Sequence, residues 1–199
     1  MAVIMLQIVG WVAFVGGTLL IGSWLRQHRD KATAERTSRA MQGLFFVGLV
    51  IPAGLGLIYP GYLQYDALLG VPPLPLRALT LVLGGILLLA GLYLMAVSLG
   101  ALRRLGHGAN AFRLTTRLAA GDIYQRVRNP MSLGYYMCCI GAGLLAGSTA
   151  ITVFALMAVI PAHLLYLICF EELEVGLRLG PAYLEYQQNV PFLIPRRVT

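Results

Sequence analysis

The chain has 199 residues, of which 58% are hydrophobic and only 12% carry a charge, about half the charged share of soluble domains. So few charged side chains cannot cover the surface of a soluble domain of this length, which excludes that class and indicates an integral membrane protein. The net charge of +7 comes without a basic stripe interleaved with aromatic residues, which argues against a nucleic-acid partner. In a membrane chain such an excess is typical of loops that face anionic lipid headgroups.

Five apolar segments are predicted to cross the membrane as helices, since a span needs about 20 apolar residues. They are residues 1–25, 41–59, 77–102, 131–147 and 149–170. The first segment lacks the basic start and the small-residue cleavage site of a signal peptide, so we expect the mature protein to keep it. The chain is therefore predicted to be all-α and polytopic.

The segments between the spans are predicted from charge and from helix breakers. Residues 26–40 are interpreted as a polar loop or a short helix, and Pro52 is expected to bend the second span near its end. Residues 147–149 (GST) are expected to form the tight turn of a hairpin between the last two spans. The sequence thus divides into a three-helix region, 1–102, and a predicted catalytic region, 103–199, which ends in an amphipathic helix.

The distribution of basic residues predicts the orientation of the chain. With five spans, every Lys and Arg except Arg77 falls on the side of the first loop, the third loop and the tail. The positive-inside rule places that side in the cytoplasm and the N-terminus outside.

Two polar features lie at the cytoplasmic ends of the predicted hairpin. Residues 126–130 (RVRNP) open the fourth span, where snorkelling arginines, a capping Asn129 and a first-turn Pro130 are ordinary features. Glu171 and Glu172 follow the fifth span, and carboxylates at the edge of hydrocarbon are costly unless they are solvated or paired. Because the hairpin returns to the same face, we expect these two features to meet.

Together they resemble the isoprenylcysteine carboxyl methyltransferase and phospholipid methyltransferase superfamily of membrane enzymes. The family signature is G-x-Y-x-x-x-R-H-P-x-Y-x-G, a hydrophobic hairpin, E-E, F-G-x-x-Y-x-x-Y and an end like V-P-x-x-I-P. The matching residues, in order, are Gly121, Tyr124, Arg128, Asn129, Pro130, Gly134, Glu171, Glu172, Leu179, Gly180, Tyr183, Tyr186 and the VPFLIP end.

The chain departs from the signature at a few positions. Asn129 replaces the commoner His, Ser132 stands where Tyr is usual, and Gly121 lies farther from Tyr124 than the signature has it. An amide offers donors and an acceptor but no charge, so a role as base is in doubt for Asn129, whereas a positioning role survives.

The resemblance implies S-adenosyl-L-methionine as the methyl donor and a lipophilic acceptor: a prenylcysteine-type carboxylate, an isoprenoid or a phospholipid amine. It implies that Arg128, Asn129 and Glu172 are catalytic, with carboxylates holding the donor's ammonium group and arginine its carboxylate. The implied cofactor-binding residues are Tyr124, Arg128, Asn129, Pro130, Gly134, Tyr135, Glu171, Glu172, Tyr183, Tyr186 and His107. Neither a metal nor a disulfide is expected, because the three cysteines lie in apolar segments without a C-x-x-C motif.

Other interpretations stay open for several of these residues. Tyr124 and Tyr135 are equally typical of interfacial aromatic anchors, and His107 is typical of a solvated loop. The GAG motif at 141–143 resembles a cofactor-binding element but is commonly a site of close helix packing. His163, inside the last span, is more typical of a packed helix residue than of a functional one. For the whole chain, the alternative is a non-catalytic membrane scaffold or lipid-binding protein that retains the fold.

Overall fold

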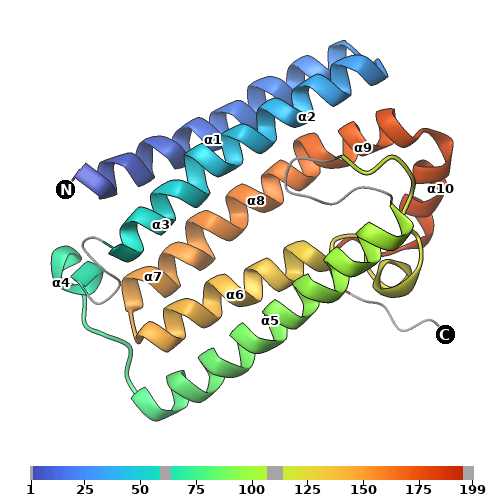
Figure 1. Cartoon of the computed structure of the whole chain (residues 1–199). Helices are drawn as coiled ribbons and strands as arrows, with labels where there is room; N and C mark the ends of the chain where they lie inside the picture. Colours follow the sequence, from blue (N-terminus) through green and yellow to red (C-terminus); the bar gives the residue numbers. More distant parts are fainter. Residues whose placement is uncertain (1, 59–63, 107–113, 195–199) are drawn as a thin grey trace.

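The computed structural model describes residues 2–58, 64–106 and 114–194, and these ranges contain helices and their connections but no strand. The helices are α1 (Ala2–Gln27), α2 (Lys31–Phe45), α3 (Ile51–Ile58), α4 (Tyr65–Leu69), α5 (Arg77–Leu105), α6 (Pro130–Ala146), α7 (Thr149–Phe154), α8 (Ile160–Tyr166), α9 (Glu172–Leu179) and α10 (Pro181–Asn189). Figure 1 shows the long helices lying side by side and running between the two ends of an elongated bundle. The predicted all-α class is confirmed for the described residues.

Three π-helical turns join shorter helices into continuous rods. Phe46–Val50 joins α2 to α3, Ala155–Val159 joins α7 to α8, and Leu167–Glu171 joins α8 to α9. Pro52 and Pro161 follow the first two turns, and each removes the hydrogen bond to a carbonyl four residues earlier, inside the turn. The bend expected at Pro52 is therefore a widened turn just before it.

Four helical segments are long and apolar enough to cross a membrane. They are Val3–Gln27, Lys31–Leu55, Arg77–Leu105 and Thr149–Leu179. The remaining apolar helix, Pro130–Ala146, is shorter, at about 26 Å for its 17 residues. The chain is thus a membrane protein, while the fifth span and the cytoplasmic orientation stay predictions.

The polar segment 26–40 is not mainly a loop but contains the first turns of the second rod. Asp30 accepts a hydrogen bond from the Thr33 N–H at 2.9 Å and so caps the start of α2. Small residues on one face, among them Ala34 and Ser38, are buried, while the charged residues remain outside. The helix therefore begins in the polar region, ahead of the apolar run that hydropathy detects.

Glycines let α5 and α6 approach backbone to backbone. A Cβ atom on Gly91 would lie 2.6 Å from the Gly134 carbonyl oxygen, and one on Gly84 would lie 2.9 Å from the Gly141 carbonyl oxygen. Gly84 and Gly91 are seven residues apart on α5, and Gly134 and Gly141 are seven residues apart on α6. Each helix therefore presents its two glycines on the same face. Larger side chains at these positions would force α6 away from α5.

At the other end of the α6 hairpin, the segment before α5 caps the turn. Asp66 accepts hydrogen bonds from the Ser148 hydroxyl at 2.9 Å and from the backbone N–H groups of Thr149 and Ala150 at 3.2 and 2.7 Å. Arg77 donates to the Leu145 carbonyl oxygen at 2.6 Å, at the C-terminus of α6. These contacts satisfy both helix termini that meet at the turn.

Replacing Asp66 by alanine is expected to lower the free energy of unfolding by about 2 kcal/mol, because it leaves a buried hydroxyl and two helix N–H groups without an acceptor. Denaturant unfolding in detergent measures this change. Asp122→Asn is the control, since its ion pair with Arg104 is exposed and contributes well under about 1 kcal/mol. Equal stability of the two variants would contradict the capping role.

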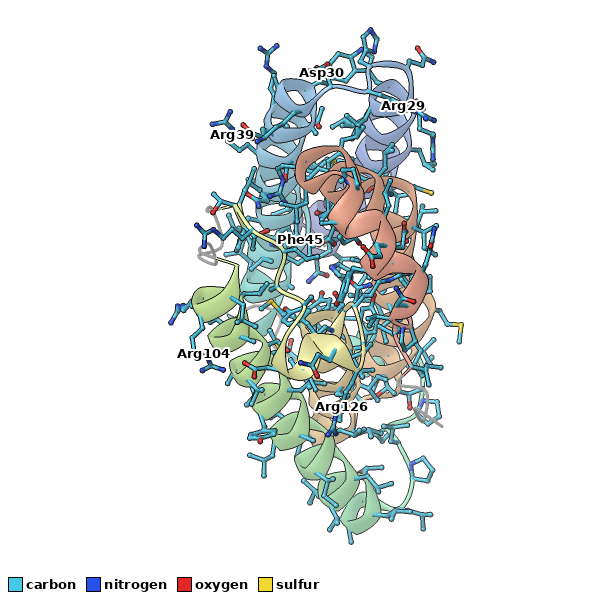
Figure 2. All side chains as sticks on the ribbon, turned by 90° about the vertical axis from the view of Figure 1, so that its right-hand side faces the viewer. Arg29, Asp30, Arg39, Phe45, Arg104 and Arg126 are labelled. Atoms are coloured by element: carbon cyan, nitrogen blue, oxygen red, sulfur yellow. The ribbon has the colours of Figure 1, made fainter. Side chains whose placement is uncertain are left out.

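The first and third connections and the C-terminal segment lie at the same end of the bundle (Figure 1). Figure 2 looks onto this end and shows Arg29, Arg39, Arg104 and Arg126 there. The prediction that the basic segments share one side of the protein is therefore confirmed for the described residues.

Candidate functional site

The ion pair between Arg128 and Glu172 is the centre of the charged end. Arg128 lies just before α6, Glu172 is the first residue of α9, and Arg128 Nη2 is 2.8 Å from Glu172 Oε1. The two side chains are only 10% and 18% exposed. The hairpin has thus brought the basic corner and the acidic pair together, as predicted from the sequence.

The C-terminal segment folds over this ion pair. The Gln187 side-chain amide donates to Glu172 Oε2 at 2.8 Å, and the Gln187 carbonyl oxygen accepts from the Arg128 guanidinium. The Arg128 backbone N–H donates to the Pro191 carbonyl oxygen at 2.9 Å, and its guanidinium carbon lies 5.6 Å from the centre of the Phe192 ring. Arg128 therefore links α6, α9 and the chain that follows α10.

Asn129 occupies the N-cap position of α6, but its side chain does not cap the helix. Its Nδ2 instead donates to the Phe192 carbonyl oxygen at 3.1 Å. Pro130 is buried at the first position of α6, where its missing N–H costs no helical hydrogen bond. Asn129 thus holds the C-terminal segment in place.

Three buried tyrosines surround the charged pair. Tyr183 and Tyr186 share one face of α10, as their spacing predicts, with ring centres 6.0 Å apart. The Tyr186 hydroxyl donates to the Tyr124 carbonyl oxygen at 2.7 Å and so ties α10 to the turn Asp122–Gln125. α10 begins at Pro181, where the missing N–H costs no helical hydrogen bond.

Burial raises the pKa values of these tyrosines, which are protonated at neutral pH in any case. It raises the pKa of Tyr186 to about 12, although the nearby Arg128 charge acts in the opposite direction. Burial also raises the pKa of Tyr124, with a further contribution from the negative charge of Glu171, and raises the pKa of Tyr183 with contributions from Glu172 and then Glu171. Their hydroxyl groups therefore act as hydrogen-bond donors.

Glu171 differs from its neighbour in lacking a partner. Within the described residues it forms neither an ion pair nor a hydrogen bond, whereas both oxygens of Glu172 are engaged. Its charge acts on Tyr124 and Tyr183, and also on Tyr136 and Tyr166 of the hairpin. A carboxylate without a partner in the protein suits a cation, which its negative charge attracts.

Arg128 retains one unused donor. Its Nε atom is buried and has no hydrogen-bond partner among the described residues, while its terminal nitrogens contact Glu172 and Gln187. A buried guanidinium N–H without an acceptor is costly, so this atom favours an anionic or carbonyl ligand.

Other predicted site residues lie elsewhere. Gly134 faces α5, where a Cβ atom would lie 2.7 Å from the Gly91 carbonyl oxygen. The ring of Tyr135 packs against Phe45 and His163, at centre distances of 6.3 and 5.4 Å. His107 lies outside the described residues.

The remaining motifs have packing roles. Gly141 contacts the backbone of α5, and a Cβ atom on Gly143 would lie 2.5 Å from the Thr152 hydroxyl oxygen. His163 is buried and its Nδ1 lies 2.9 Å from the Tyr136 hydroxyl. The packed interpretations of GAG and His163 agree with these contacts.

A second buried ion pair was not predicted. Arg178 Nε lies 2.7 Å from Glu174 Oε1, with side chains only 6% and 2% exposed, and its guanidinium also donates to the Thr115 carbonyl oxygen. The two residues are four positions apart, a spacing at which opposite charges meet on a helix. This spacing is the signal in the sequence from which the pair could have been predicted.

Comparison with known proteins gives one family match, over the hairpin region. A sequence model described as phospholipid methyltransferase matches residues 79–175. No curated protein and no solved structure matches the chain. The matched segment runs from α5 through α6 to the first turn of α9 and includes both members of the Arg128–Glu172 pair. The match covers just under half of the 199 residues, and it confirms the resemblance of this segment to the superfamily of integral membrane methyltransferases.

Proposed function

We propose that the chain is an S-adenosyl-L-methionine-dependent methyltransferase that modifies a lipophilic acceptor at the cytoplasmic face of the membrane. The observation that carries the proposal is the unpaired Glu171 carboxylate, surrounded by tyrosines and next to the Arg128–Glu172 pair. When bound, the cofactor supplies an electrophilic methyl group on a sulfonium centre.

The residues at the site fit the charges of this cofactor. Glu171 attracts its cationic groups, and its charge acts on the nearby Tyr124 and Tyr183. The free Nε of Arg128 offers a donor to its carboxylate. Glu172, Gln187 and Asn129 are proposed to position Arg128 and the C-terminal segment, because their polar groups already have partners in the protein.

The acceptor is proposed to enter from the bilayer, between helices. Since methyl transfer is an in-line displacement, the protein contributes mainly positioning and exclusion of water. A carboxylate acceptor needs no base, whereas an amine or a thiol must first lose a proton. Mass spectrometry of membrane extracts incubated with the protein and isotope-labelled cofactor identifies the product, and indifference to acceptor lipophilicity would contradict entry from the bilayer.

Glu171→Gln is expected to weaken cofactor binding about tenfold or more, because it removes the charge of the one acidic side chain proposed to contact the cation. Equilibrium binding of labelled cofactor to purified protein in detergent measures the effect. Glu185→Gln is the matched control, as Glu185 is exposed on α10 at the same end.

The outcomes separate the competing functions. Unchanged binding in Glu171→Gln, with binding intact in the wild type, would remove Glu171 from the site but keep the methyltransferase. No binding by the wild type would favour the alternative of a non-catalytic membrane scaffold or lipid-binding protein.

A further inference from the structure

An apolar groove lies between α1 and α2, which run side by side at the charged end of the bundle (Figure 1). Its volume is about 380 Å³, and we call it the α1–α2 groove. It is lined by Leu20, Ile21, Trp24, Arg36, Thr37 and Ala40. Leu20, Ile21 and Trp24 belong to the apolar segment of α1, whereas Arg36, Thr37 and Ala40 belong to the polar first turns of α2, so the groove lies where the apolar part of the bundle meets its polar end.

The lining of the groove is apolar except for Arg36 and Thr37, and it changes in character along the bundle. The Thr37 hydroxyl donates to the Thr33 carbonyl oxygen of its own helix at 2.8 Å, which leaves it no need for a water. Leu20 and Ala40 lie deeper, while Trp24 is three residues from the end of α1, about 5 Å along the axis. Trp24 is 41% exposed, which suits an aromatic ring at the level of the lipid headgroups.

Arg36 supplies a positive charge at the shallow end of the groove. The ion pairs of the described residues join Arg104 to Asp122, Arg128 to Glu172 and Arg178 to Glu174, so Arg36 takes part in none. No acidic residue lines the groove. The apolar stem of an arginine can cover hydrocarbon while its guanidinium reaches up to the headgroup layer.

We propose that the α1–α2 groove binds one phospholipid with an anionic headgroup. An acyl chain fills the apolar part, from Trp24 down to Leu20 and Ala40, and the lipid phosphate contacts the guanidinium of Arg36. Arg26, Arg29 and Lys31, at the adjoining ends of α1 and α2, add positive charge above the headgroup. The site lies on helices outside the family match, so it is separate from the proposed methyl-transfer site.

The test uses the two tryptophans of the chain. Trp11→Phe leaves Trp24 as the only tryptophan, in the wall of the groove. The variant is reconstituted into vesicles of unlabelled phosphatidylcholine. Increasing amounts of a lipid that is brominated near the top of one acyl chain are added, either phosphatidylglycerol or phosphatidylcholine. Bromine quenches tryptophan fluorescence on contact, so the titration gives the affinity of the groove for each headgroup.

We expect phosphatidylglycerol to be favoured about fivefold, the preference that one basic side chain near a membrane surface confers. Arg36→Gln should bring the preference to near unity. Arg39→Gln, one turn away on α2 and outside the groove lining, should retain it. Equal losses in the two variants would assign the preference to the general surface potential and overturn the site. Quenching by neither lipid would show that lipid does not reach Trp24, and would overturn the site as well.

Discussion

Replacing Arg128 by alanine is expected to abolish methyl transfer and to lower the free energy of unfolding by about 3–5 kcal/mol. The substitution leaves Glu172 without its ionic partner in a region where that side chain is only 18% exposed. It also removes the donor to the Gln187 carbonyl and the cation that faces Phe192. The C-terminal segment then keeps the contacts of Asn129 and Tyr186 but loses those of the Arg128 side chain.

The control for this variant is Arg126→Ala. Arg126 is exposed, two residues earlier in the same polar corner, and makes no ion pair with a described residue. Denaturant unfolding in detergent and transfer of a labelled methyl group to membrane extract measure stability and activity. Full activity of Arg128→Ala at a temperature where it stays folded would contradict a role for Arg128 in the site.

A charge-removing double variant separates stability from binding. Arg128→Gln with Glu172→Gln keeps hydrogen-bonding groups at both positions but removes the desolvated charges, so it should be more stable than Arg128→Ala. Because it lacks the guanidinium proposed to contact the cofactor carboxylate, it should nevertheless bind labelled cofactor at least about tenfold more weakly.

The contact between Arg128 and Glu172 could be predicted from the number of helices between them. Two apolar runs joined by a tight turn must return to the same end, whatever the details of their packing. The Gly147-Ser148 turn fixes that geometry: Gly147 adopts a left-handed conformation with φ of 68°, and Ser148 caps α7. The positions of Arg128 and Glu172 next to their apolar segments are therefore enough to predict that they meet.

The start of the second rod could not be predicted from hydropathy. A transfer scale detects where a helix enters hydrocarbon, but α2 begins at Lys31, in the polar region, with its charges facing outward. The signal that marks its start is Asp30, whose carboxylate caps the helix through Thr33. Capping signals therefore locate helix ends that apolar runs miss.

The different roles of Glu171 and Glu172 also escaped prediction. Neighbouring residues on a regular helix point about 100° apart. The π-helical turn Leu167–Glu171 changes this angle just before Glu172, and no proline follows it as a signal in the sequence. Likewise, no local pattern links Asp66 to Ser148, because their hydrogen bond joins segments 82 positions apart. Both features depend on tertiary packing.

Glu174→Ala is expected to be as destabilising as Arg128→Ala, by about 3–5 kcal/mol, but to leave the activity of each folded molecule unchanged. Glu174 and Arg178 are 2% and 6% exposed, so removal of the carboxylate leaves an almost fully buried guanidinium whose remaining partners are the carbonyl and hydroxyl oxygens of Thr115. The pair joins α9 to the segment before the turn Asp122–Gln125 and makes no hydrogen bond or ion pair with Glu171, although the charges of both members act on Glu171.

Replacing both members by methionine, Glu174→Met with Arg178→Met, should recover most of that stability, since an apolar pair of similar volume carries no desolvation cost. Unfolding in detergent measures stability, and labelled methyl transfer, divided by the folded fraction, measures activity. A double variant no more stable than Glu174→Ala would show that the pair specifies the fold through the Thr115 contact rather than by charge balance. A loss of activity per folded molecule would place Glu174 in the methyl-transfer site beside Glu171.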